Sequence, residues 1–295
     1  MTFTALGPYP ILRRLGHGGM AEVFLAVAHG ASGFERRVAL KTLLPGLMNE
    51  PSLERALIHE ARVAGRLAHR NLVAVLGLGV DQGVTYVVME WVDGGDLAAL
   101  LRGRRLPAPL ALLVAEELAL GLDYLHRACD DRGLPLGLVH RDVSPSNVLL
   151  SRAGEVKLGD FGIAKATALA DLTGGTRKGK YAYMSPEQLA GEPLDERSDQ
   201  FALGVVLVEM LTGTRPFDAD TPLATMENVR QGARPDLSFL PAQVATLALR
   251  TLAPGPADRF ASSEELRQAL ARARREWPPA GPPELAAWIA GAPPA

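Results

Sequence analysis

Residues 140–147 read HRDVSPSN, and residues 160–162 read DFG. Two aspartates, Asp142 and Asp160, therefore stand 18 positions apart, with Asn147 between them. Carboxylate and amide oxygens are hard ligands that suit Mg²⁺ held together with phosphate groups. An aspartate outside the metal site can accept the proton of an attacking hydroxyl. These two stretches predict a site for metal and phosphate chemistry.

A glycine-rich stretch, LGHGGMAEV at residues 15–23, lies upstream between two segments that read as strands. Glycine has no Cβ, so the backbone can come close to phosphate oxygens. The third glycine of a G-x-G-x-x-G pattern is replaced by Ala21, and residues 23–28 read as a strand where a dinucleotide fold needs a helix. Taken alone, the stretch is equally an ordinary glycine-rich hairpin.

Two charged residues in the same half of the chain need partners. Lys41 ends the apolar run VALK, where it could anchor phosphates or extend along a sheet edge into water. Glu60 follows 19 positions later, near the apolar face of a helical stretch. An unpaired carboxylate there is costly, so Glu60 either has a cation as its partner or lies on the surface.

Hydrophobic periodicity divides the chain into two parts. Short Val- and Leu-rich runs predict strands at 11–15, 23–28, 38–43, 72–80 and 84–90, with one helix at 52–68. Beyond residue 95 the pattern predicts helices at 110–127, 198–212, 222–231, 241–252 and 262–275, and short strands at 148–150 and 156–158. Strands first and helices later indicate an α+β fold with two segregated parts, joined near residues 91–95.

Composition excludes several classes of protein. The 295 residues are 47% hydrophobic and 22% charged with a net charge of −2, which excludes a disordered chain and a bulk basic field for nucleic acid. The single cysteine, Cys129, excludes an intrachain disulfide framework and fits a reducing compartment. The N-terminus lacks the pattern of a secretory signal, and the apolar run at 201–208 is far shorter than the about 20 residues of a membrane span. We therefore expect a cytoplasmic protein.

Taken together, these stretches resemble those of a eukaryotic-type protein kinase, and most of all those of the bacterial Ser/Thr kinase branch. The phrases GMAEV at 19–23 and YMSPEQ at 183–188 resemble that branch, and the likeness runs from about Tyr9 to Arg275. The resemblance implies a two-lobed kinase fold: a β-rich N-lobe with one helix at 1–91, then the hinge and a mostly helical C-lobe at 92–275. Residues 276–295 are rich in Pro and Ala and predict a linker or loose tail, although Trp288 could anchor a short docking helix.

The resemblance also implies ATP and Mg²⁺ and assigns roles to residues. Lys41 would hold the α- and β-phosphates and pair with Glu60. Asp142 would orient and deprotonate the acceptor hydroxyl, and Asn147 and Asp160 would hold Mg²⁺.

The expected nucleotide-binding residues fall into groups. The glycine-rich loop would cover the phosphates, one residue would be the gatekeeper, two would bind adenine through their backbone, one would meet the ribose, and three would sandwich the adenine ring or be plain core. In that order they are Leu15, Gly16, His17, Gly18, Gly19, Met20, Ala21, Glu22 and Val23; Met89; Glu90 and Val92; Asp96; and Val23, Ala39 and Leu149, with Lys41 on the phosphates.

Other matches imply structural roles. Glu187 would pair with a distant arginine, for which Arg259 is the candidate, and Asp199 would hold the catalytic loop. His140 and Phe161 would be internal packing residues. The remaining histidines, at 17, 29, 59, 69 and 126, show no metal-ligand spacing and read as surface or core.

Two departures from the family pattern concern the acceptor side. The Ser/Thr branch has a lysine two residues after the catalytic aspartate, and here that residue is Ser144; Lys180 stands where the branch has a threonine. We expect Lys180 to supply the missing cation, with a lysine on a basic loop facing solvent as the alternative. Thr173 and Thr176 are candidate phosphorylation sites that would pair with Arg141.

The resulting prediction is a protein kinase that transfers the γ-phosphoryl group of ATP to Ser or Thr hydroxyls of proteins, itself included. Its partners would be ATP and protein substrates, with no nucleic acid and no membrane span in this chain, and a dimer is compatible with autophosphorylation in trans. The alternatives are a pseudokinase that acts as a nucleotide-binding scaffold, which Ser144 favours, and a small-molecule phosphotransferase.

Overall fold

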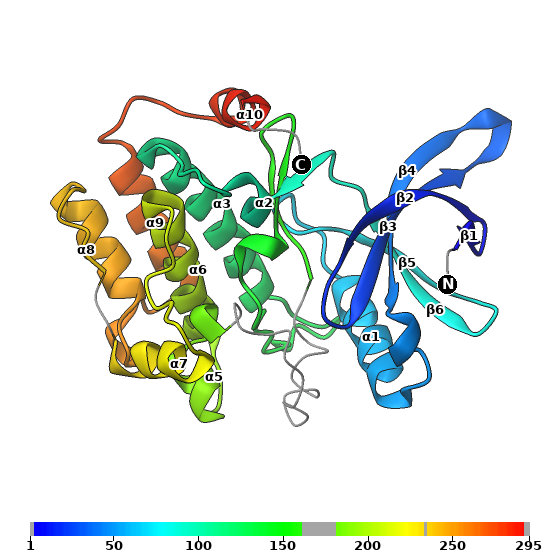
Figure 1. Ribbon diagram of the computed structural model, residues 1–295, viewed down its shortest axis with the longest axis horizontal. Coiled ribbons are helices and arrows are strands. Elements are labelled where there is room, and N and C mark those ends of the chain that lie inside the picture. Colours follow the sequence, from blue (N-terminus) through cyan, green and yellow to red (C-terminus); the bar gives the residue numbers. More distant parts are fainter. Residues whose placement is uncertain (1–2, 161–180, 233–234, 292–295) are drawn as a thin grey trace. The chain divides into compact units, whose positions relative to one another are not determined.

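The computed structural model describes residues 3–160, 181–232 and 235–291, and all structural statements concern these residues. They divide into two compact units (Figure 1). The first unit contains residues up to His69 together with Val73–Val92. The second contains Arg70–Leu72, residues 93–160 and the residues from 181 onward. The change from strands to helices that the sequence predicts thus falls between Val92 and Asp93, and each unit is described by itself.

The first unit is built on an antiparallel sheet of six strands in the order β1-β2-β3-β4-β6-β5. Alternation along the strands gives this sheet two different faces. One face packs into a buried cluster that includes Phe24, Leu40 and Val88. The strands are β1 Ala5–Leu6, β2 Tyr9–His17, β3 Ala21–His29, β4 Glu35–Leu43, β5 Val75–Asp81 and β6 Val84–Glu90.

A single long helix, α1 (Pro51–Ala64), accompanies the sheet and buries Leu57, Ala61 and Ala64. It ends four residues before the predicted end at residue 68. The reason is Gly65, a poor helix former, whose N–H bonds the Ala61 carbonyl before the chain tightens into a last turn with i→i−3 bonds.

Strand β5 begins at Val75, three residues later than predicted. Leu72, which the sequence assigns to that strand, instead forms a parallel bridge with Leu158 in the second unit. An apolar run alone does not show which sheet a residue joins.

The second unit packs helices around the buried α3 and α6, with α9 beside α3 (Figure 1). Along α6 the residues from Ser198 to Val208 are buried on all sides, so this helix forms the core of the unit. The helices are α2 Leu97–Leu100, α3 Ala108–His126, α5 Pro186–Ala190, α6 Glu196–Thr212, α7 Pro222–Gln231, α8 Ala242–Thr251, α9 Ser263–Arg274 and α10 Pro282–Ala290. A small sheet joins β7 Gly94–Asp96, β8 Val148–Ser151 and β9 Val156–Leu158.

The expectation of a loose tail is wrong for residues 282–290, which form helix α10. Leu285 is fully buried, and Ile289 is nearly so. The Arg104 guanidinium lies 4.1 Å from the centre of the Trp288 ring and donates a hydrogen bond to the Trp288 carbonyl. Gly154 touches the Pro282 backbone so closely that a Cβ would clash. Proline-rich composition hid a helix whose prolines occupy its first turn, where they are tolerated.

No helix among the described residues is both long enough and apolar enough to cross a membrane.

Candidate active site

The second face of the six-stranded sheet gathers the predicted nucleotide residues of the first unit. In the antiparallel register Val23 lies opposite Lys41, and Ala39 lies opposite Met89. Ala39 and Lys41 are two positions apart on β4, so their side chains point to the same side. This register brings Val23, Ala39, Lys41 and Met89 onto one face of the sheet.

Lys41 and Glu60 form an ion pair with 2.8 Å between Nζ and Oε1. Both side chains are nearly buried, with 12% and 10% of their surfaces exposed. This pair answers the two questions that the sequence leaves open, because each residue is the partner that the other requires. A charge-assisted bond at low exposure fixes the ammonium group of a long, flexible lysine in one place.

The glycine-rich stretch is the turn between β2 and β3. Gly16 pairs with Val23 and His17 with Glu22, and the Gly18 N–H donates to the Ala21 carbonyl at 2.8 Å. No atom outside the adjoining residues lies within 4 Å of where a Cβ of Gly16 or Gly19 would be, so these glycines are not required by packing. A strand follows the turn, as predicted, and a dinucleotide-binding fold is excluded.

The remaining predicted residues lie at the end of the first unit: Glu90 is the last residue of β6, and Val92 follows it by two positions. The Glu90 carboxylate accepts a hydrogen bond from the Ala74 N–H at 2.8 Å, and the Glu90 N–H donates to the Ala74 carbonyl at 2.9 Å. These two bonds anchor the end of the strand and fix the backbone of the residues that follow Met89.

In the second unit, the HRD stretch forms a loop with an unusual backbone. Arg141 has φ of 66°, which lies in the left-handed region. A residue with a side chain reaches that region at a cost of about 1–2 kcal/mol, so surrounding bonds must hold it there. Two such bonds come from the Asp199 carboxylate, which accepts the His140 N–H at 2.7 Å and the Arg141 N–H at 2.8 Å.

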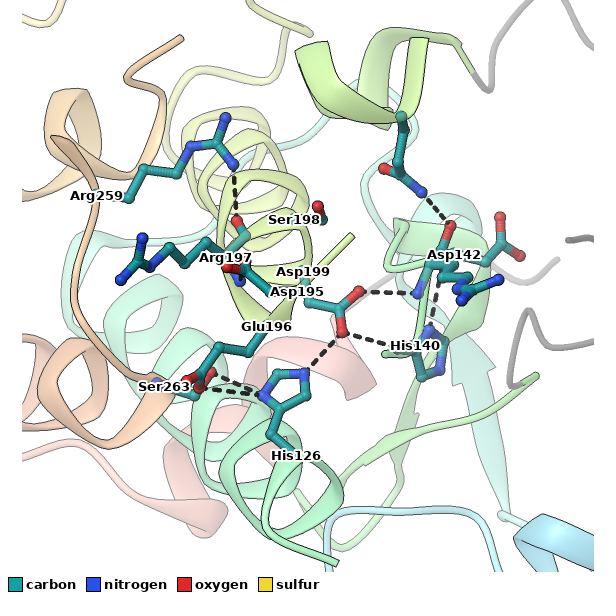
Figure 2. A network of polar contacts seen from close by, with 12 residues as sticks. His126, His140, Asp142, Asp195, Glu196, Arg197, Ser198, Asp199, Arg259 and Ser263 are labelled. Atoms are coloured by element: carbon teal, nitrogen blue, oxygen red, sulfur yellow. Dashed lines mark hydrogen bonds and ion pairs between the residues drawn. The ribbon is translucent and has the colours of Figure 1, made fainter. Parts of the chain in front are cut away.

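Asp199 also binds a residue that the sequence analysis did not select. His126, at the end of α3, places Nε2 2.8 Å from the second oxygen of Asp199, and its Nδ1 lies 3.1 Å from the Ser263 hydroxyl (Figure 2). Burial raises the pKa of Asp199, but the hydrogen bond and charge of His126 and the contacts with His140 outweigh it and leave the pKa below its usual value. His126 gave no signal in sequence, because its partners lie 73 and 137 residues away.

Asn147 connects the two ends of the HRD loop. Its Nδ2 group donates to the Asp142 carbonyl at 2.7 Å and to the Asp142 carboxylate at 2.5 Å. The Gly159 N–H donates to the Asn147 carbonyl at 2.8 Å, so Asp160 follows directly beside Asn147 at the base of the β8–β9 hairpin. Asp142, Asn147 and Asp160 are thus brought together, as their predicted roles require. Asp160 also has a left-handed backbone, with φ of 54°.

The side-chain oxygen atoms of Asn147 and Asp160 fit a magnesium ion bound together with phosphates. An amide oxygen and a carboxylate are hard ligands, and Mg²⁺ is usually held by one or two protein groups plus substrate phosphates. Among the residues described, no group of three or more His, Cys, Asp or Glu side chains could hold a metal unaided.

Asp96 and Leu149 belong to the small sheet of the second unit, where they lie opposite each other on β7 and β8. The Asp96 carboxylate accepts the Ala99 N–H at 2.7 Å and so caps helix α2. These two residues lie in a different unit from Val23, Ala39 and Met89.

The predicted structural pair is present. Arg259 binds both oxygens of Glu187 at 2.7 and 2.9 Å, and Ser198 donates to the same carboxylate at 2.6 Å. Burial raises the pKa of Glu187, but the hydrogen bonds from Arg259 and Ser198 outweigh it and leave the pKa below its usual value. The Arg259 guanidinium also lies 5.0 Å from the centre of the Phe201 ring. Glu187 of α5 is thus tied to the buried helix α6 by Ser198 directly and by Arg259 through its contact with Phe201.

Ser144, the departure in the catalytic loop, is buried, and its hydroxyl lies 3.0 Å from that of Ser146. The other predicted residues of the acceptor side are Lys180, Thr173 and Thr176, and they lie outside the described residues, as does Phe161. His140 is fully buried, as expected of a packing residue, and its Nδ1 accepts the Asp142 N–H at 3.4 Å.

Known proteins resemble this chain in both sequence and fold. The protein kinase domain family matches residues 9–270. The chain is 44% identical to the tyrosine-protein kinase MasK of Myxococcus xanthus, over 90% of this chain and 42% of MasK. It is 34% identical to the serine/threonine-protein kinase PknB of Mycobacterium leprae, over 92% of this chain and 44% of PknB. The kinase domain of PknI from Mycobacterium tuberculosis has a TM-score of 0.65 at 31% identity, covering 91% of this chain and 97% of that domain.

The chain spans less than half the length of MasK and of PknB. The matching part is the one that carries the HRD loop, the Lys41–Glu60 ion pair and the Glu187–Arg259 pair. The family match over most of the chain, together with this geometry, shows that the chain belongs to the protein kinase domain family.

Proposed function

We propose that this chain is a protein kinase that transfers the γ-phosphoryl group of ATP to Ser or Thr hydroxyls of proteins, including its own. The observation that carries the proposal is the link between Asp142 and Asn147. One amide group holds both the carbonyl and the carboxylate of Asp142, and its own carbonyl oxygen stays available to a metal. A base and a metal ligand are thereby held at a fixed separation, as phosphoryl transfer requires.

The residues have separate tasks in this reaction. Lys41, held by Glu60, neutralises charge on the nucleotide phosphates. Asp142 orients the acceptor hydroxyl and accepts its proton. Asn147 and Asp160 hold Mg²⁺, which when bound supplies positive charge to the phosphate oxygens. Val23, Ala39 and Leu149 would sandwich the adenine and Met89 would be the gatekeeper. Glu90 and Val92 would bind the adenine through their backbone, Asp96 would meet the ribose, and residues 15–23 would cover the phosphates.

The acceptor class has a second candidate, tyrosine. Ser144 stands where the Ser/Thr branch has a lysine, and it is buried against Ser146 rather than exposed. A relative 44% identical to this chain is named a tyrosine-protein kinase, whereas PknB is named a serine/threonine-protein kinase. Identification of the phosphorylated residues after reaction with Mg-ATP decides between the two acceptor classes.

We further propose that Lys180 replaces the positive charge that Ser144 lacks. A cation placed where charge gathers in the transition state is worth several kcal/mol in a site that excludes water, on the order of the effect of an oxyanion-hole donor. Lys180→Thr should then be slowed severely, and the added change Ser144→Lys should restore much of the rate. No loss in Lys180→Thr, or no gain in the double variant, refutes this assignment.

The scaffold alternative is disfavoured because the residues expected for catalysis are all present: Lys41, Glu60, Asp142, Asn147 and Asp160. The test is incorporation of phosphate from labelled ATP into the chain and into a general acceptor such as myelin basic protein. Nucleotide binding without incorporation into either would support the scaffold.

A further inference from the structure

Gln188 connects helix α5 to the backbone beside the proposed catalytic base. It is the third residue of α5, and its side chain is bonded at both ends. The carbonyl oxygen of the side chain accepts the Ser185 N–H at 2.9 Å. The amide nitrogen donates to the Arg141 carbonyl at 3.0 Å, across 47 residues of sequence.

The Arg141 carbonyl belongs to the peptide bond that carries Asp142. In a planar trans peptide the carbonyl and the N–H point in opposite directions, so two contacts on opposite edges fix the plane. Gln188 holds the carbonyl edge, and His140 Nδ1 accepts the Asp142 N–H on the other edge. The bonds from Asp199 end one peptide earlier, at the Arg141 N–H (Figure 2).

The left-handed backbone of Arg141 makes this peptide plane the one most in need of support. A change in the Arg141 ψ angle would turn the peptide and carry the Asp142 Cα with it. Asp199 fixes the residue from its N–H side, while Gln188 binds the carbonyl that moves with ψ.

The bond to the Arg141 carbonyl also explains why residue 188 is a glutamine and not a glutamate. Ser185 and Gln188 form a capping box, in which the fourth residue can be Glu or Gln because only an acceptor is needed. The bond to the Arg141 carbonyl needs a donor, which a carboxylate lacks. A glutamine therefore serves the helix cap and the loop at once.

We propose that Gln188 is a positioning residue for Asp142: through the Arg141 carbonyl it fixes the peptide plane that carries the catalytic carboxylate. This inference rests on the proposed kinase function. It predicts that Gln188 acts on phosphoryl transfer and not on nucleotide affinity or on the stability of α5.

Two variants separate the bond between Gln188 and Arg141 from the role of Gln188 in the helix cap. Gln188→Glu keeps the acceptor for the Ser185 N–H and removes the donor to Arg141. Ser185→Ala is the matched control, because it removes the other half of the box, the bond from the Gln188 N–H to the Ser185 hydroxyl at 3.3 Å, and leaves both side-chain bonds of Gln188 in place.

For Gln188→Glu we expect kcat to fall about tenfold or more, with KM for ATP and for the acceptor peptide within about twofold of wild type. Its melting temperature should stay within a few degrees of wild type. Ser185→Ala should keep kcat within about twofold. A near-wild-type kcat in Gln188→Glu, or an equal loss in Ser185→Ala, would overturn the proposal.

Hydrogen exchange followed by mass spectrometry gives a readout that does not require activity. Amides in residues 139–147 should exchange faster in Gln188→Glu than in wild type, while those of α5 keep their protection. Unchanged exchange in that loop overturns the positioning role. If wild type transfers no phosphate, the kinase proposal fails in the kinetic assay, and the exchange experiment still decides whether Gln188 holds the loop.

Discussion

Asp199 holds the HRD loop through two hydrogen bonds and binds His126 of α3 through a third, and Asp199→Asn tests how much stability they supply. One carboxylate oxygen accepts the Arg141 N–H, and the other accepts the His140 N–H and faces His126 Nε2. Asparagine has one acceptor oxygen, so its amide group must meet one of these donors with a donor of its own. In either orientation one buried N–H loses its partner.

The size of the effect follows from these contacts. A buried donor without a partner costs about 1–3 kcal/mol. The bonding that remains goes to a neutral amide oxygen instead of a carboxylate, which weakens it by about 1 kcal/mol. The substitution also removes the cost of keeping the Asp199 charge away from water, and this offsets part of the loss. We therefore expect Asp199→Asn to lower the free energy of unfolding by about 2–3 kcal/mol, and the melting temperature by about 4–12 °C for a chain of this size.

Thermal unfolding followed by tryptophan fluorescence measures the change, because the chain has three tryptophans. Asp195→Asn is the matched control, since the same substitution is made four residues earlier. Asp195 caps α6 by accepting the Arg197 N–H at 2.8 Å, and asparagine caps a helix equally well. The reasoning is refuted if Asp199→Asn melts within about 1 °C of wild type, or if both variants lose the same stability.

Three further predictions concern other parts of the chain. Lys41→Met should abolish phosphoryl transfer while the circular dichroism spectrum stays that of wild type; retained activity would remove Lys41 from the mechanism. Leu285→Ala should lower the free energy of unfolding by about 2–5 kcal/mol in urea titrations, whereas a loose tail would give no change. The stability difference between wild type and Glu187→Gln should shrink as pH falls below about 4.5. In the folded protein the pKa of Glu187 lies below its ordinary value of 4.5. The ion pair with Arg259 therefore stabilises the fold fully above about pH 4.5 and is lost as the carboxyl group protonates at lower pH. A stability difference that is independent of pH contradicts this.

Much of the fold was predictable because its signals are local. The α+β division, the strand at 84–90 and the helix at 222–231 follow from periodicity and turn residues, and the structure agrees. The end of α1 at Ala64 was missed, because a single Gly65 outweighs an apolar pattern that continues beyond it. Helix α10 was foreseen only as an alternative to a loose tail, because Arg104, which contacts Trp288, is distant in sequence, and the burial of Leu285 has no local signal.

The residues of the candidate site also divide into those that the sequence indicated and those that it did not. Lys41 and Glu60 were paired in advance only through the family resemblance, because the residues alone left an extended lysine and a surface glutamate open. His126 could not be found in this way, because it stands in no motif, and the capping box of Gln188 gives no sign of its bond to Arg141. Their contacts depend on how α3, α5 and α6 meet the catalytic loop, and one sequence carries no signal of that arrangement.

The measurement that tests the central claim most directly is the intact mass of wild type and Asp142→Asn after incubation with Mg-ATP, followed by mapping of the phosphorylated residues. Wild type should gain increments of about 80 Da, each a phosphoryl group on a Ser or Thr side chain. Asp142→Asn should gain none, while it melts within a few degrees of wild type and still binds nucleotide. Equal increments in both proteins would show that Asp142 is not the catalytic base and would contradict the account.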